Sequence, residues 1–267
     1  MAKTENKTIG KLLLLLEKVP KYLREGPWSL MAYFVIFTFV YALLFTFPIV
    51  KDSLSEPSRR LFDVNIFWLQ LYRLSMGCYC LILVNVLVKN AGYLPLASYT
   101  VTSWNLLTMR LLLSFAGEYS SFLRAASDLF RFPALVGCSI TVTIWWSAIV
   151  PLIYALSDSK GREDFWKFNW HPMLVNLHLL NLPIVAVEFV LTGAPLTLFD
   201  LWLGYLVALL YILFYLNVLD ARGLHFYIIL TPRTVFCIVP YIVIVLLYFI
   251  IYSQWNKALV FSSQLFF

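Results

Sequence analysis

Charged residues are scarce in this chain: they make up 13% of its 267 residues, whereas 61% are hydrophobic and the mean hydropathy is +0.81. Soluble domains carry about 25% charged residues and about half apolar ones. The scarcity excludes an ordinary soluble globular domain. It predicts an all-α membrane protein, a polytopic helical bundle.

Cysteine is also rare, and its four occurrences all lie inside apolar runs, at Cys78, Cys80, Cys138 and Cys237. Their spacing fits neither a zinc motif nor the disulfide framework of a small secreted domain. We expect them to be buried small apolar residues without a redox role. HExxH, GxSxG, Walker and dinucleotide-binding glycine patterns are absent too, so no metal site and no cofactor is predicted.

The net charge of +6 is not gathered into a basic patch interleaved with aromatic residues, which argues against a nucleic-acid partner. Membrane topology and anionic lipid headgroups account for it, and we expect membrane lipids as partners. The apolar run at 12–16 is too short for a signal-peptide core. We interpret residues 1–27 as a basic amphipathic segment on the cytoplasmic side of the membrane. The sequence does not indicate an oligomeric state.

About 20 apolar residues span a bilayer core, and the chain holds six to seven segments of that length. The transmembrane domain is predicted at 28–254, followed by a short C-terminal tail at 255–267. With seven spans, the loops on the N-terminal side carry about twice as many Lys and Arg residues as those on the other side. This bias places the N-terminus in the cytoplasm. The seven expected spans are 28–50, 66–88, 94–116, 133–156, 172–192, 198–218 and 234–254.

Polar residues interrupt the fifth expected span, where His178, Asn181 and Glu188 fall near one helical face. Ionisable residues at this depth are costly and frequently functional. Glu188 lies ten residues after His178, about 15 Å along the helix axis, so it is not a direct partner of the histidine. We expect Glu188 near the membrane interface, and we expect Arg73 and Arg110 to face the inside of the bundle.

The third expected span carries a second polar stripe, formed by Ser98, Thr102 and Asn105. Counted from the expected starts of their spans, Thr102 and His178 lie at about 12 Å and about 9 Å of depth. Because these two spans run in the same direction, both side chains can lie at one level. A hydroxyl beside a histidine base is the minimum requirement for nucleophilic acyl transfer.

Three stretches resemble the androgen-induced and androgen-dependent membrane proteins, and more distantly the rolling stone-type proteins. They are YTVTSWNLLTMRLLLSF at 99–115, SDLFRFPALVGCSITVTIWW at 127–146 and HLLNLPIVAVEF at 178–189. In the third stretch a proline follows His178 after five residues and a glutamate after ten, as in that family. GLHFY at 223–227 is similar to the family's Gly-x-x-x-Tyr.

The resemblance covers about 66–254 and implies a threonine hydrolase that cleaves fatty-acid esters of hydroxy fatty acids. It places Thr102 as the nucleophile and His178 as the base. From their helical faces, Asn105 and Asn181 are candidates for orienting the histidine or stabilising the oxyanion. It also implies a multi-pass protein of the endomembrane system, such as the endoplasmic reticulum, or of the plasma membrane.

Two other functions fit the same residues. A transporter of protons or small solutes would use Arg73, Arg110, His178 and Glu188 to line a polar path. A non-catalytic membrane protein would keep the fold without the chemistry. The family often has a second histidine three residues before the catalytic one, and here that position is Val175.

Overall fold

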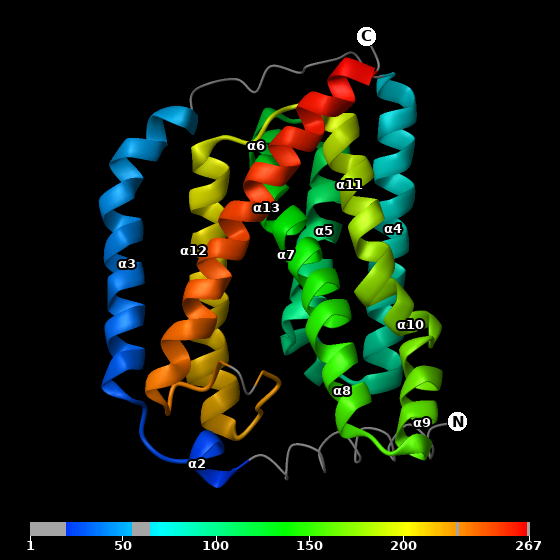
Figure 1. Cartoon of the computed structure of the whole chain (residues 1–267). Helices are drawn as coiled ribbons and strands as arrows, with labels where there is room; N and C mark the ends of the chain where they lie inside the picture. The colour runs from blue at the N-terminus through cyan, green and yellow to red at the C-terminus, as the bar shows by residue number, and fades with distance from the viewer. Residues whose placement is uncertain (1–19, 55–64, 228–229, 266–267) are drawn as a thin grey trace. The chain divides into compact units, whose positions relative to one another are not determined.

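A computed structural model describes residues 20–54, 65–227 and 230–265, and all the secondary structure in these ranges is helical (Figure 1). Within them, six segments are long and apolar enough to cross a membrane. The prediction of an all-α polytopic membrane protein is confirmed. These segments are Leu30–Val50, Ile66–Ala91, Ser121–Ala155, Pro172–Thr192, Leu198–Arg222 and Val235–Gln264.

The expected span at 94–116 differs from the others. Residues Leu94–Ala97 form a short 3-10 turn, and helix α5 runs only from Tyr99 to Ala116. Its polar composition keeps it out of the group of six. Polar residues such as Ser103, Thr108 and Arg110 are buried in α5. A helix that packs its polar groups against other helices does not need a lipid-compatible surface.

The chain divides into two compact units, and the first comprises Met1–Lys51 and Tyr205–Leu247. Ser29 caps α3 and donates a hydrogen bond to the Pro232 carbonyl oxygen. Asp220 accepts two hydrogen bonds from Arg233, at 2.8 and 2.7 Å, and lies 3.0 Å from Nδ1 of His225. The unit contains α2 (Lys21–Arg24), α3 (Leu30–Val50), the turns Asp220–Arg222 and Val235–Cys237, and parts of α12 (Leu198–Phe214) and α13 (Ile238–Leu265).

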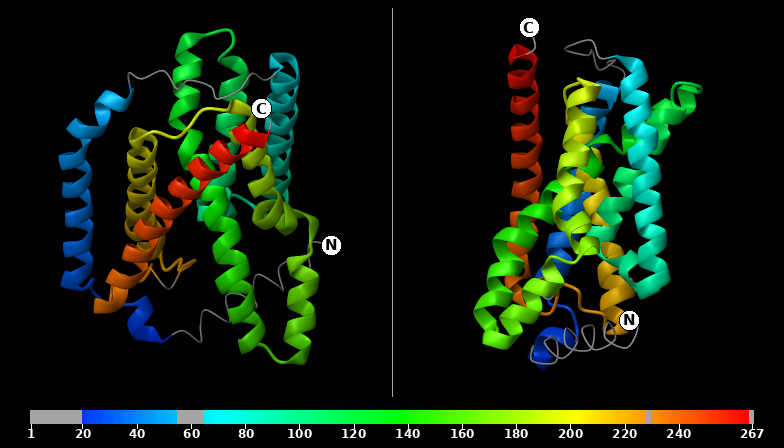
Figure 2. Two further views of the ribbon diagram at one scale, coloured as in Figure 1. Left: turned by 45° about the horizontal axis from the view of Figure 1, so that its top comes forward. Right: turned by 90° about the vertical axis from the view of Figure 1, so that its right-hand side faces the viewer.

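The second unit comprises Asp52–Gly204 and Tyr248–Phe267 and contains helices α4 to α11. The turn between α8 and α9 lies at the opposite end of this unit from the turn between α5 and α6 (Figure 2). Its helices are α4 (Ile66–Ala91), α5, α6 (Ser121–Leu129), α7 (Arg131–Ile144), α8 (Val150–Leu156), α9 (Ser159–Asn169), α10 (Pro172–Val175) and α11 (Asn181–Thr192).

Helix α5 packs against α4 on one side and α7 on another. The indole N–H of Trp104 donates to the Cys80 carbonyl oxygen at 3.1 Å, which ties α5 to α4. On the α7 side, a Cβ added at Gly137 would lie 2.7 Å from Oγ of Ser103. Only glycine therefore allows α7 to approach α5 this closely. Helix α11 joins the packing through Tyr72, whose hydroxyl donates to the Ile184 carbonyl oxygen at 2.6 Å.

Several boundaries differ from the sequence-based expectations. Helix α13 continues to Leu265, so the residues expected as a tail from 255 are mostly helical. Cys78 is exposed, whereas the other three cysteines are buried as expected. The leucine run at 12–16 lies outside the described residues, and only the end of the expected basic segment, with α2, is described.

Candidate active site

Two widened helical turns meet in the second unit, at Trp145–Ile149 and Asn176–Leu180, and both are π-helical. Each comes shortly before a proline, Pro151 or Pro183. Proline has no amide hydrogen, and its ring clashes with the carbonyl four residues earlier, which favours such a local change in winding. π-Helical turns of this kind are frequent at functional sites.

His178 lies in the second of these turns and is 8% exposed. Its ring stacks on the indole of Trp145, with the ring centroids 3.8 Å apart and the planes 22° from parallel. The neighbouring Trp146 donates its indole N–H to the His178 carbonyl oxygen at 2.9 Å. The histidine ring is therefore held in one orientation by the first widened turn.

The two ring nitrogens of His178 have different surroundings. Nδ1 lies 3.3 Å from the carbonyl oxygen of Leu174, one turn earlier in the same helical segment. A carbonyl oxygen can only accept a hydrogen bond, so this contact requires the proton on Nδ1. In the neutral ring, Nε2 then carries the lone pair and is the acceptor.

Nε2 of His178 lies 3.5 Å from the hydroxyl oxygen of Thr100. Thr100 is the second residue of α5 and is half-buried. The hydroxyl can donate to Nε2, and the Leu174 carbonyl orients the ring from its other side. Catalytic hydrogen bonds of this type are often long before substrate binds and shorten in the complex.

The structure brings His178 to Thr100, and not to Thr102 as the sequence suggested. Within the described chain, no hydrogen bond joins Thr102 to His178. Residues two apart on an α-helix point about 200° apart, so Thr102 faces away from the histidine when Thr100 faces it. The depth of about 12 Å was counted from residue 94, whereas α5 begins at Tyr99, and Thr102 is about 4.5 Å past that start.

The other expected site residues have different positions. Ser98 is the N-cap of α5, where its hydroxyl accepts from the Val101 amide at 3.3 Å, so it is not part of a helical stripe. Asn105 is half-buried. Asn181 is 0% exposed, and neither atom of its side-chain amide has a hydrogen-bond partner among the described residues.

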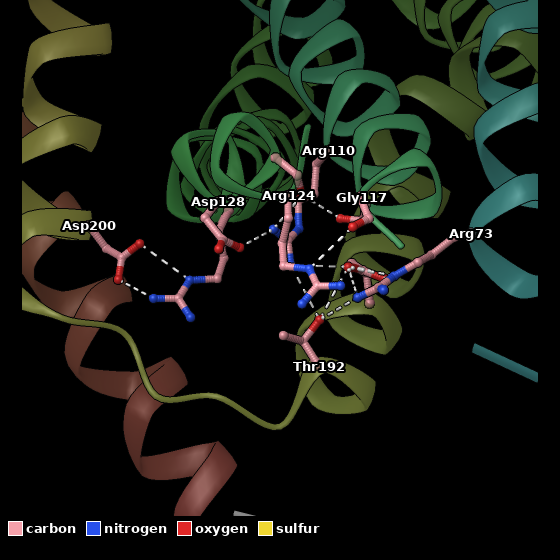
Figure 3. A network of polar contacts seen from close by, with 11 residues as sticks. Arg73, Arg110, Gly117, Arg124, Asp128, Thr192 and Asp200 are labelled. Carbon is pink, nitrogen blue, oxygen red and sulfur yellow. Dashed lines mark hydrogen bonds and ion pairs between the residues drawn. The ribbon is translucent and has the colours of Figure 1, made fainter. Parts of the chain in front are cut away.

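Glu188 was expected near the membrane interface; it lies four residues before the end of the apolar segment Pro172–Thr192, and its side chain is buried. It is 2% exposed, and its carboxylate pairs with two arginines, Arg73 and Arg110, which are labelled in Figure 3. Arg73 donates to its carboxylate from Nε and Nη2, at 2.9 to 3.2 Å. Nη2 of Arg110 lies 3.2 Å from the same carboxylate, and the Thr192 hydroxyl donates to it at 3.2 Å. Burying an unpaired carboxylate costs several kcal/mol, and the ion pairs with the two arginines offset that cost.

Arg110 has further hydrogen-bond partners besides Glu188. Arg110 also donates from Nη1 to Ser127 and to Asp128, at 2.9 Å each. Arg131 of α7 makes a separate buried pair with Asp200 of α12, and Thr197 donates its amide N–H to Asp200 at 2.7 Å. The expectation that Arg73 and Arg110 face the inside of the bundle is confirmed. Their charges are paired with nearby carboxylates.

The sequence did not predict that Thr100 and Trp145 contact His178, nor which residues pair with Glu188. One local signal indicates where α5 begins: Ser98 follows a proline-containing turn and is a preferred N-cap residue, which sets the helix start at Tyr99. The stacking of Trp145 on His178 depends on two helices far apart in the sequence. No pattern within either segment indicates that contact.

No family model matches the chain, and no curated protein or solved structure shows a match to it. Within the described residues, no group of three or more His, Cys, Asp or Glu side chains could hold a metal ion. The function is therefore inferred from the geometry around His178.

Proposed function

We propose that the protein is an intramembrane hydrolase of lipid carboxylic esters, with Thr100 as the nucleophile and His178 as the base. The observation that carries this proposal is the 3.5 Å contact between Nε2 of His178 and the Thr100 hydroxyl. A nucleophile beside a base, with that base oriented by a third group, is the arrangement that acyl transfer requires. Here the third group is the Leu174 carbonyl oxygen.

In the first step, the Thr100 oxygen attacks the ester carbonyl carbon while Nε2 of His178 takes the hydroxyl proton. The tetrahedral intermediate then collapses, the C–O bond to the alcohol breaks, and His178 gives the proton to the departing alkoxide. Water attacks the acyl-threonine with His178 again as the base. This second step releases the fatty acid and restores the threonine hydroxyl.

The position of Thr100 at the start of α5 favours this chemistry. The first N–H groups of an α-helix have no carbonyl partner inside the helix, and this end of the helix carries partial positive charge. Negative charge that develops on the substrate beside Thr100 is stabilised there. The apolar helices around the site suit a substrate that is itself dissolved in the membrane.

The sequence resemblance supports fatty-acid esters of hydroxy fatty acids as the substrate class. We also propose a cytoplasmic N-terminus, supported by the Lys and Arg distribution, and a location in the endoplasmic reticulum or another endomembrane, or in the plasma membrane. The orientation is tested by introducing single cysteines into the loops of the protein and labelling them in intact membranes from one side.

The test of the activity is hydrolysis of a fatty-acid ester of a hydroxy fatty acid by the purified protein in detergent. Thr100→Val keeps the shape of the side chain and removes the hydroxyl, so we expect no turnover. His178→Gln removes the base, and we expect a loss of about 10²- to 10⁴-fold. Thr102→Val is the matched control and retains turnover.

The controls separate the alternatives. Turnover that survives Thr100→Val and disappears with Thr102→Val would move the nucleophile to Thr102, as in the resembling family. A folded wild-type protein that hydrolyses no ester would exclude the hydrolase. Solute flux into liposomes that persists in Thr100→Val would then favour a transporter.

A further inference from the structure

Two buried polar side chains near His178 lack partners in the described chain: both amide atoms of Asn181 and the hydroxyl of Thr141. Asn181 is 0% exposed and Thr141 is 5% exposed. Buried polar atoms in native proteins are almost always hydrogen-bonded, so each exception calls for an explanation. In apolar surroundings, an unpaired amide is especially costly.

The helix contacts place these two side chains at one level. Trp145 of the α7–α8 segment stacks on His178 of the α10–α11 segment, and the two segments run in opposite directions (Figure 1). One turn back from Trp145 is Thr141. Three residues forward from His178 is Asn181. Moving one turn in this antiparallel pair therefore leads from the stacked rings to Thr141 and Asn181 together.

The contact between α5 and α7 brings Thr100 to the same level. Gly137 lies against Ser103, and these helices also run in opposite directions (Figure 1). One turn forward from Gly137 is Thr141, and one turn back from Ser103 is Tyr99, the neighbour of Thr100. The unpaired groups thus lie where α5, α7 and α11 converge, beside the proposed nucleophile and base.

We infer that the Asn181 amide, aided by the Thr141 hydroxyl, is the oxyanion site of the ester hydrolysis. This inference rests on the proposed function. Attack by Thr100 turns the ester carbonyl oxygen into an oxyanion, which needs donors fixed in advance. The Asn181 Nδ2 group has two N–H donors and the Thr141 hydroxyl has one. When the intermediate collapses, the electron pair returns from the oxygen to re-form the carbonyl, and both donors remain unchanged.

The Asn181 amide and the Thr141 hydroxyl would bind the ester carbonyl oxygen before attack, and their hydrogen bonds would strengthen as negative charge develops on that oxygen. An amide that does not ionise keeps its donors at every physiological pH. That property distinguishes Asn181 from Arg73, Arg110 and Arg131, whose charges are paired with buried carboxylates.

Asn181→Leu and Thr141→Val test this inference in the full-length protein, with kcat, KM and the thermal midpoint in detergent as readouts. For Asn181→Leu we expect kcat to fall by about 10²- to 10³-fold, with little change in KM. We expect the midpoint to stay the same or rise, because an unpaired buried amide is replaced by an apolar group of similar size. Thr141→Val should lower kcat by a smaller factor, about tenfold.

Asn217→Leu is the control, because Asn217 is an exposed amide of the other unit that donates to the Leu213 carbonyl oxygen. It should leave kcat unchanged. If Asn181→Leu does not fold, the smaller Asn181→Ala serves for the same kinetic comparison. An unchanged kcat in a folded Asn181 variant, with Thr100→Val inactive, would overturn the oxyanion site and leave the hydrolase intact. A wild-type protein without esterase activity would overturn both.

Discussion

The second unit contains two buried polar clusters, and they differ in the hydrogen-bond partners of their side chains. The arginine cluster consists of Arg73, Arg110, Glu188 and Thr192, and the Glu188 carboxylate receives hydrogen bonds or ion pairs from the other three. The histidine cluster consists of Thr100, Thr141, Trp145, His178 and Asn181, and here the amide of Asn181 and the hydroxyl of Thr141 have no partner in the described chain.

The two clusters differ in how completely their buried polar groups are hydrogen-bonded. In lipid, polar groups must be satisfied within the protein, and the arginine cluster meets this demand almost completely. One exception is Nε of Arg110, which has no partner among the described residues. The histidine cluster keeps several polar groups unpaired around a hydroxyl and a base. Such a cluster lowers stability unless another group completes its hydrogen bonds, and under the proposed function the substrate is that group.

The largest effect should come from breaking the arginine cluster. Glu188→Leu leaves two buried guanidinium groups without their shared carboxylate, and we expect a loss of about 3–5 kcal/mol in the free energy of unfolding. Denaturant unfolding in detergent measures it. Replacing Arg73 and Arg110 by Met in the same chain should restore much of the stability. A single Glu188→Leu variant as stable as wild type would show that this cluster does not hold the helices.

A smaller effect is expected when the histidine loses its stacked ring. Trp145→Leu removes an aromatic contact that typically contributes about 0.5–1.5 kcal/mol. If this contact orients the base, ester turnover should fall by up to about tenfold. Trp166→Leu is the matched control, because the ring partners of Trp166 in the described residues are Tyr154, Phe165 and Trp170, and not His178. Equal losses in the two variants would contradict the orienting role of Trp145.

The smallest effect should come from an exposed ion pair. Nζ of Lys167 lies 2.6 Å from the Glu163 carboxylate on α9, and this hydrogen bond raises the pKa of Lys167. Both side chains are exposed, so solvent screens the pair. Glu163→Gln should leave the thermal midpoint unchanged. A shift as large as that of Glu188→Leu would mean that burial does not decide the strength of these pairs.

The sequence was enough to predict the helical membrane fold, because a run of about 20 apolar residues indicates a membrane-spanning helix. It also sufficed for the inward-facing arginines. It did not predict the partners of Glu188, since helical rise gives the distance to His178 but not the arginines of α4 and α5 that surround the carboxylate. It selected Thr102 from the stripe with Ser98 and Asn105, the depth estimate and the family resemblance, and none of these shows which face of α5 is turned toward His178.

The central claim is that Thr100 is the nucleophile, and the site of covalent modification tests it most directly. The purified protein is reacted with a lipid fluorophosphonate, digested, and the modified residue is located by fragment-ion mass spectrometry. We predict an adduct on Thr100 that is lost in Thr100→Val, is retained in Thr102→Val and forms much more slowly in His178→Gln. An adduct on Thr102, or labelling that is unaffected by Thr100→Val and His178→Gln, would contradict the account.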